Sequence, residues 1–195
     1  MTDTQNKISL KISQDIYNSV VSAKNFNNDI NVGNIGEILA TQYLEQLGLK
    51  FIRKSEESAD LKKWDLEFAQ NDKLYRYEIK NDVYILPPKI FVSDKLTSPI
   101  KLNGRDTGNI FIEFYCRNKP SGITTTTADV WMNFFFHLKE LWMIPVSKLR
   151  QLISNNEFRI SEESGDINSH TKGYLIPRNN FRNHFKVINY DIDFN

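Results

Sequence analysis

The sequence has few of the residues that form cross-linked or zinc-bound folds. Its 195 residues include one cysteine, Cys116, and three histidines that lie far apart. A single cysteine excludes an internal disulfide, and histidines without metal-binding spacing give no zinc site. No glycine-rich phosphate loop of the NTPase type is present either. We expect a protein of a reducing compartment.

Long apolar runs and an excess of one charge are also lacking. No run approaches the ~20 apolar residues that a membrane span requires, and residues 1–25 lack the apolar stretch of an export signal. The net charge of +1 excludes the strongly basic character of a nonspecific nucleic-acid coat, but leaves room for a locally basic cleft. We expect a soluble, cytoplasmic protein that does not act on membranes.

The chain contains 40% hydrophobic residues, enough for a sizeable core in one domain. We expect an N-terminal arm or helix over residues 1–32, followed by a single domain over residues 33–195. Hydrophobic spacing predicts an α/β fold whose mixed central sheet is flanked by helices. The clearest helix runs from Asn34 to Leu47 and ends at Gly48.

Further elements follow from the same patterns. Gln14–Lys24 is expected to be either a helix or a loosely packed arm. Helices are expected at Ala128–Leu138, with Thr127 as the N-cap, and from Ser147 to about Ile153. Strands are expected at Leu49–Arg53, Trp64–Ala69, Leu74–Lys80, Lys89–Val92, Asn109–Cys116, Leu141–Val146, Gly173–Ile176 and Phe185–Tyr190. Of these strands, Asn109–Cys116 is apolar enough to be central in the sheet.

The segments Trp64–Ala69 and Leu74–Lys80 resemble the two arms of a β-hairpin. A turn centred on Asn71 and Asp72 places Asp65 opposite Glu78. Alternation then divides the arms into an apolar face and a charged face. The apolar face would hold Trp64, Leu66, Phe68, Tyr75, Tyr77 and Ile79, and the charged face Asp65, Glu67, Arg76, Glu78 and Lys80.

Two carboxylates opposed in this way need a neutralising partner. Their Cβ atoms would lie roughly 4.5–5.5 Å apart, so Asp65 and Glu78 would repel each other without a cation. Mg²⁺ suits such oxygen donors, and Lys80 would lie beside it on the same face. The alternative is an ordinary solvated face, with Glu67 and Arg76 as a surface ion pair. An odd-length loop or a bulge would break the alignment.

Glu37 is a further acidic residue, near the start of the clear helix and off its apolar stripe. It is either a favourably placed charge near a helix N-terminus or a third acidic group directed at the same site.

The order of these residues resembles the catalytic core of the PD-(D/E)xK nuclease superfamily: Gly36 and Glu37 on a helix, Asp65 on a strand, then Glu78, Ile79 and Lys80 on its hairpin partner. Four later blocks are similar to the strand, loop, helix and strand that follow in small phage or mobile-element nucleases. These blocks are Asn109–Phe114, Lys119–Ile123, Thr127–Trp131 and Leu141–Leu149. The resemblance covers roughly residues 33–177, with Trp64 where the family name expects proline.

The resemblance implies a restriction-endonuclease-like core and metal-dependent hydrolysis of DNA phosphodiester bonds. Asp65, Glu78, Glu37 and the Ile79 carbonyl match the family's metal ligands, with Mg²⁺ as the expected ion and Mn²⁺ as a substitute. Lys80 matches the lysine that orients the attacking water and stabilises charge on the phosphate. The expected setting is a bacterial or phage-infected cell, and a homodimer would suit cutting two strands.

The loop Arg117–Thr127 is the candidate DNA contact. Its basic residues would hold phosphates, its glycine would let the backbone approach, and its hydroxyls would donate to the phosphodiester chain. These residues are Arg117, Lys119, Ser121, Gly122, Thr124 and Thr126. An ordinary surface loop is the alternative. For the whole chain, the alternatives to an endonuclease are a Holliday-junction resolvase or exonuclease, a noncatalytic nucleic-acid-binding module, or an unrelated α/β protein.

Overall fold

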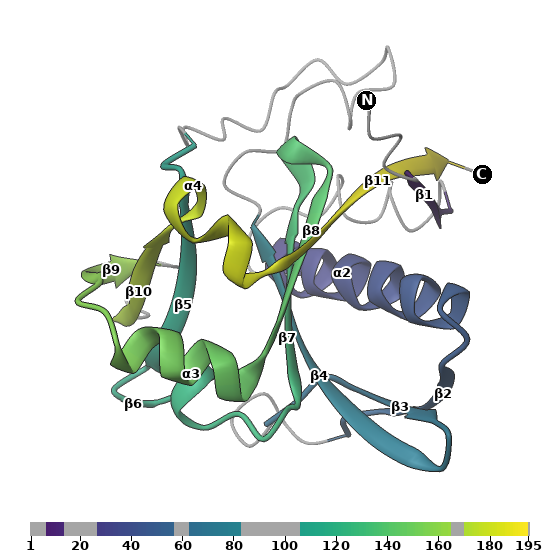
Figure 1. Ribbon diagram of the computed structural model, residues 1–195, viewed down its shortest axis with the longest axis horizontal. Helices are drawn as coiled ribbons and strands as arrows, with labels where there is room; N and C mark the ends of the chain where they lie inside the picture. Colours follow the sequence, from purple (N-terminus) through teal and green to yellow (C-terminus); the bar gives the residue numbers. More distant parts are fainter. Residues whose placement is uncertain (1–6, 14–26, 57–62, 83–105, 165–169, 195) are drawn as a thin grey trace.

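The computed structural model describes residues 7–13, 27–56, 63–82, 106–164 and 170–194 (Figure 1). The helices are α2 (Asn27–Gln46), α3 (Val146–Ser154) and α4 (Arg178–Phe181), with 3-10 turns η1 (Gly122–Thr124), η2 (Phe136–Leu138) and η3 (Arg182–His184). The strands are β1 (Ile8–Ile12), β2 (Lys50–Lys54), β3 (Leu66–Gln70), β4 (Lys73–Asp82), β5 (Asn109–Cys116), β6 (Lys119–Pro120), β7 (Val130–Phe135), β8 (Glu140–Pro145), β9 (Arg159–Ser164), β10 (Thr171–Pro177) and β11 (Lys186–Phe194).

The strands form two sheets. A seven-stranded mixed sheet has the order β1-β11-β8-β7-β4-β3-β2, and a four-stranded antiparallel sheet has the order β6-β5-β10-β9. In the larger sheet β4 and β7 are parallel, as are β1 and β11. Figure 1 shows α2 on one side of β4 and β7, and the smaller sheet with α3 on the other. The predicted α/β class with a mixed sheet is confirmed.

Two hydrophobic cores lie on opposite faces of the larger sheet. The first fills the space between the sheet and α2, and includes Ile35 and Leu39 of α2 with Phe68 and Phe134 of the sheet. The second lies between the sheet, α3 and the smaller sheet. Its members include Trp131, Trp142, Leu149, Ile110 and Ile176. The central strands are therefore covered by apolar side chains on both sides.

The predicted helix Ala128–Leu138 is wrong. This segment forms β7 and the single turn η2, and Thr127 caps no helix. Trp131 and Phe135 enter the second core, whereas Met132 and Phe134 enter the first. A strand buried on both faces has apolar residues at nearly every position, so its sequence lacks the alternation that marks a strand with one solvated face.

The strand Asn109–Cys116 is confirmed as β5, but it is not central in the larger sheet. It lies between β6 and β10 in the smaller sheet. A strand pattern gives the buried positions but not the sheet that the strand joins.

Most other predicted elements are confirmed. The clear helix is α2, which starts earlier, at Asn27, and is followed by Gly48 at φ +80°. Helix α3 starts at Val146, so Pro145 rather than Ser147 occupies the N-cap position. Strands β1, β6 and β9 were not predicted. The expected elements Gln14–Lys24 and Lys89–Val92 lie outside the described residues.

No helix in the described parts of the chain is both long enough and apolar enough to cross a membrane.

A charged cluster closes one end of the second core. Arg178 Nη2 lies 2.5 Å from both carboxylate oxygens of Asp106, and His137 Nε2 lies 3.2 Å from Asp106 Oδ2. The buried Arg178 guanidinium also lies 4.8 Å from the ring centroid of Phe135. Burial alone would raise the pKa of Asp106, but hydrogen bonds from Gly108, Arg178 and His137 outweigh it and lower that pKa from 3.8 to about 2.

This lowered pKa predicts a pH-dependent contribution of Asp106 to stability. The contribution is fully present above pH 3.8 and is lost as the pH falls through about 2. Urea unfolding of the wild-type protein and Asp106→Asn, compared from neutral pH downward, would measure it. We expect the wild type to have the larger free energy of unfolding near neutral pH. The difference from Asp106→Asn should shrink as the pH falls from 3.8 to about 2. A difference that does not change with pH would contradict the assignment.

Candidate functional site

The hairpin predicted from the sequence is formed by β3 and β4. Asn71 and Asp72 both have positive φ, 49° and 61°, as a two-residue type I′ turn requires. The resulting register pairs Glu67 with Arg76 and Leu66 with Tyr77. The predicted register is therefore confirmed along the whole of β3.

A β-bulge interrupts the pairing at Asp65. The Asp65 N–H donates to the Tyr77 carbonyl at 2.8 Å, although Tyr77 is already the partner of Leu66. Two residues thus lie opposite one, and the alternation of side chains shifts before Leu66. Trp64, expected on the face of Leu66, instead packs into the second core. Asp65 does not form the simple strand pair with Glu78 that an uninterrupted hairpin would give.

The Asp65 carboxylate is nevertheless fixed beside the other candidate residues. Its Oδ2 atom accepts the N–H of Ile79 at 2.6 Å, and Ile79 lies between Glu78 and Lys80 in β4. The Ile79 side chain itself belongs to the first core. Both Asp65 and Glu78 are buried, so their charges need compensation nearby.

Lys80 and Thr126 hold the Glu78 carboxylate. Lys80 Nζ lies 2.8 Å from Glu78 Oε1, and Thr126 Oγ1 lies 3.0 Å from Glu78 Oε2. The same hydroxyl lies 2.8 Å from the Lys63 carbonyl and accepts the Ala128 N–H at 3.2 Å. Both oxygens of Glu78 therefore have a polar partner that fixes the orientation of the carboxylate.

The Lys80 ammonium is paired with an acidic group and attracted by two more. Burial alone would lower the pKa of Lys80, but attraction to Glu78, then to Asp65 and Glu113, outweighs burial and raises this pKa above its ordinary value. The ammonium also lies 5.6 Å from the ring centroid of Trp131. Lys80 is thus held as a cation by its ion pair with Glu78, and attraction to Asp65 and Glu113 adds to this effect.

Two residues of this group were missed in the sequence. Glu113 comes from β5 of the smaller sheet and accepts the Ser121 hydroxyl. Asn133 is buried in β7 at the position paired with Lys80. The pairing of Asn133 could not be foreseen while its segment was predicted helical. The position of Glu113 depends on how the two sheets pack, for which the sequence carries no signal.

The third predicted acid, Glu37, has a different partner. It forms an ion pair with Lys54 of β2, and Lys54 Nζ also donates to Asn34 Oδ1 at 3.2 Å. Neighbouring Gly36 allows α2 to approach β4, since a Cβ there would lie 2.1 Å from Asn81 Oδ1. The role of Glu37 as a metal ligand stays a prediction.

The residues present fit Mg²⁺ in their donor chemistry. Among the described residues, no group of three or more His, Cys, Asp or Glu side chains is arranged to hold a metal ion. Mg²⁺, however, usually takes only one or two carboxylates and completes its shell with water and substrate phosphate. Asp65 and Glu78 supply such a pair of oxygen donors, each held by a hydrogen bond.

The predicted DNA-contact loop divides into an exposed turn and an anchored part. Arg117 lies in the turn between β5 and β6, and Lys119 is exposed beside it. In the anchored part, the Thr124 hydroxyl donates to the Phe114 carbonyl at 3.1 Å. Gly122 has φ +50°, and a Cβ there would lie 2.3 Å from the Glu113 carbonyl oxygen. DNA binding by the loop stays a prediction.

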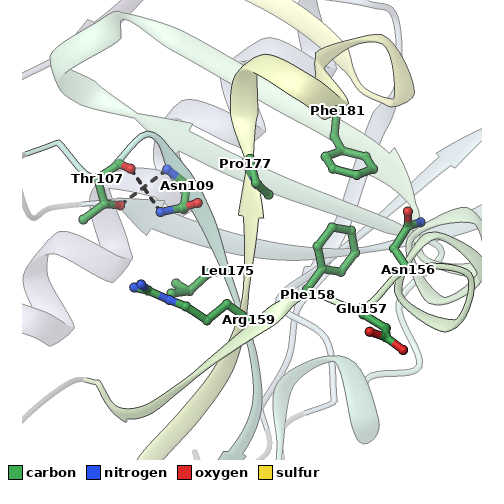
Figure 2. Close-up of a pocket in the computed structure, with 9 residues that line it drawn as sticks. All are labelled: Thr107, Asn109, Asn156, Glu157, Phe158, Arg159, Leu175, Pro177 and Phe181. Carbon is green, nitrogen blue, oxygen red and sulfur yellow. Dashed lines mark hydrogen bonds between the residues drawn. The ribbon is translucent and has the colours of Figure 1, made fainter.

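Two cavities lie outside this group of residues. One, of about 510 Å³, is lined by Thr107, Asn109, Asn156, Glu157, Phe158, Arg159, Leu175, Pro177 and Phe181. Figure 2 shows the Phe158 and Phe181 rings together at one side of it and the bonded pair Thr107 and Asn109 at the other. The second, of about 590 Å³, adjoins the candidate site and is lined by Arg53, Ser55, Glu56, Lys63, Trp64, Arg76 and Thr127.

Comparison with protein-family models, with curated proteins and with solved structures finds no match to this chain.

Proposed function

We propose that the protein is a metal-dependent DNA endonuclease that hydrolyses phosphodiester bonds and has a restriction-endonuclease-like core. The observation that carries this proposal is the group at one end of the hairpin, in which Lys80 lies 2.8 Å from buried Glu78 and Asp65 binds the intervening N–H of Ile79. A cation beside two acids that suit a divalent ion is a combination useful for phosphoryl transfer. The order of these residues along the chain, which resembles the PD-(D/E)xK pattern, supports the same reaction.

Each residue has a separate task in this proposal. Asp65 and Glu78 would hold Mg²⁺ or Mn²⁺, and the bound ion would supply Lewis-acid polarisation of the phosphoryl group. Lys80 orients the attacking water and stabilises the negative charge that develops on the phosphate. The Ile79 N–H and the Thr126 hydroxyl keep the two carboxylates in fixed orientations, which limits reorganisation during the reaction.

A noncatalytic nucleic-acid-binding module is the second candidate. The ion pair between Glu37 and Lys54 favours this candidate, because it engages the residue that was predicted as the third metal ligand. Such a protein would bind DNA equally well with and without a divalent ion and would not cut it.

Incubation with linear, circular and branched DNA, in Mg²⁺, Mn²⁺ or EDTA, separates these candidates. We expect cleavage of circular DNA with either ion and none in EDTA. Cutting confined to ends or to branched DNA would replace the endonuclease by an exonuclease or a junction resolvase. DNA binding without cleavage in any metal would favour the noncatalytic module.

A further inference from the structure

A row of three charged side chains crosses β2, β3 and β4. The strand registers pair Arg53 with Glu67 and Glu67 with Arg76. The Nε atoms of both arginines lie 2.9 Å from Glu67, each on a different carboxylate oxygen. The Glu67 side chain is only 3% exposed, whereas Arg53 and Arg76 are 56% and 40% exposed. One buried acid thus fixes two cations that remain open to solvent.

This arrangement is more than the ordinary surface ion pair considered from the sequence. One arginine would suffice to balance the charge of Glu67, so the second is in excess. Each guanidinium uses its Nε on Glu67, and its two terminal nitrogens make no hydrogen bond within the described parts of the chain.

The cleft of about 590 Å³ lies over this row, and we call it the arginine cleft. Its lining contains three cations, Arg53, Lys63 and Arg76, against one acid, Glu56. Both guanidiniums lie 5.2 Å from the ring centroid of Trp64, which the bulge at Asp65 turns toward this side of the sheet. The cleft is therefore a preorganised basic surface with an aromatic wall.

The arginine cleft adjoins the candidate catalytic group. Trp64 precedes Asp65, and Thr127 follows Thr126, whose hydroxyl contacts Glu78. Arg76 precedes Glu78 by two positions in β4, which places the two Cα atoms about 7 Å apart along one face.

We infer that the arginine cleft binds a backbone phosphate of the DNA, close to the phosphate that is cut. This inference rests on the proposed function for the identity of the polyanion. The terminal nitrogens of Arg53 and Arg76 present paired donors of the kind that bind phosphate oxygens, and Lys63 adds a third charge. Glu67 acts as a positioning residue that holds both guanidiniums at the cleft.

DNA binding measured in EDTA tests the inference without requiring cleavage. The probe is a short fluorescein-labelled DNA duplex, followed by fluorescence anisotropy at several salt concentrations. Lys63→Gln removes one cation, whereas the triple variant Arg53→Met, Glu67→Leu, Arg76→Met removes the two arginines together with their buried acid. The triple variant avoids leaving Glu67 buried without a partner. Lys186→Gln, at an exposed position of β11, is the control, and every variant lowers the net charge by one.

We expect weaker binding from Lys63→Gln and the triple variant, with the slope of log affinity against log salt reduced by about 1 for each phosphate that the protein no longer neutralises. Lys186→Gln should bind like the wild type, and circular dichroism should show every variant folded. Equal affinities in all variants would overturn the inference, even if the wild type cuts DNA. Cleft-dependent binding by a protein that cuts nothing in Mg²⁺ would instead remove only the proposed catalysis.

Discussion

Lys80→Met is expected to reduce the rate of Mg²⁺-dependent DNA cleavage by about 10²–10³-fold, the decrease typical when one group that stabilises transition-state charge is removed. Methionine retains an unbranched apolar stem beside Trp131 but offers no cation at the position 2.8 Å from Glu78. The measurement is the single-turnover cleavage rate at saturating protein, which separates chemistry from DNA binding.

Two controls accompany this variant. Lys186→Met removes a lysine from an exposed position of β11, and its rate should match the wild type. Thermal unfolding would show whether removing the partner of Glu78 disturbs the fold. A folded Lys80→Met protein that cuts at the wild-type rate would remove Lys80 from the proposed mechanism.

The second large effect is expected from Phe134→Ala, with a decrease of about 3–5 kcal/mol in the free energy of unfolding. Phe134 is 0% exposed in β7, and its ring centroid lies 5.7 Å from that of Tyr190 and 6.2 Å from that of Phe136. Removing the ring leaves a cavity in the first core. Urea unfolding would measure the decrease, which is a large part of the roughly 5–15 kcal/mol that holds a typical domain folded.

Phe51→Ala is the matched control for this prediction. Phe51 is 38% exposed on the edge strand β2, although its ring still contacts Phe68. Its removal should cost much less than that of Phe134, because water already reaches one side of the ring. Equal decreases from the two variants would contradict the placement of Phe134 in the core.

The hairpin shows what the sequence could predict. Its register depends on a local signal, because Asn71 and Asp72 accept the positive φ of a type I′ turn and the flanking residues alternate. The same local signal does not predict the position of Asp65. A bulge depends on how the strand leaves the sheet, and here it turns Trp64 toward the second core.

The remaining parts of the site depend on contacts between distant segments. Glu113 of the smaller sheet adds to the electrostatic attraction on Lys80, and Thr126 contacts Glu78 from the loop before β7. The sequence around Glu113 or Thr126 contains no local pattern that would predict these positions. The segment Val130–Phe135 was predicted to be helical for a related reason. Its burial on both faces depends on packing against two separate layers, which the local sequence does not reveal.

The position of β11 bears on the order in which the protein assembles. This strand lies between β8 and β1, pairing with β8 through residues 186–189 and with β1 through residues 190–194. Strand β1 has an earlier partner in α2, because the Gln42 side chain bonds the main-chain N–H and carbonyl of Lys11, each at 2.7 Å. Pairing of Ile8 with Tyr190 closes a very long loop, and such pairings form slowly. We therefore expect the insertion of β11 between β8 and β1 to limit the rate of folding. The local hairpin of β3 and β4 should form faster.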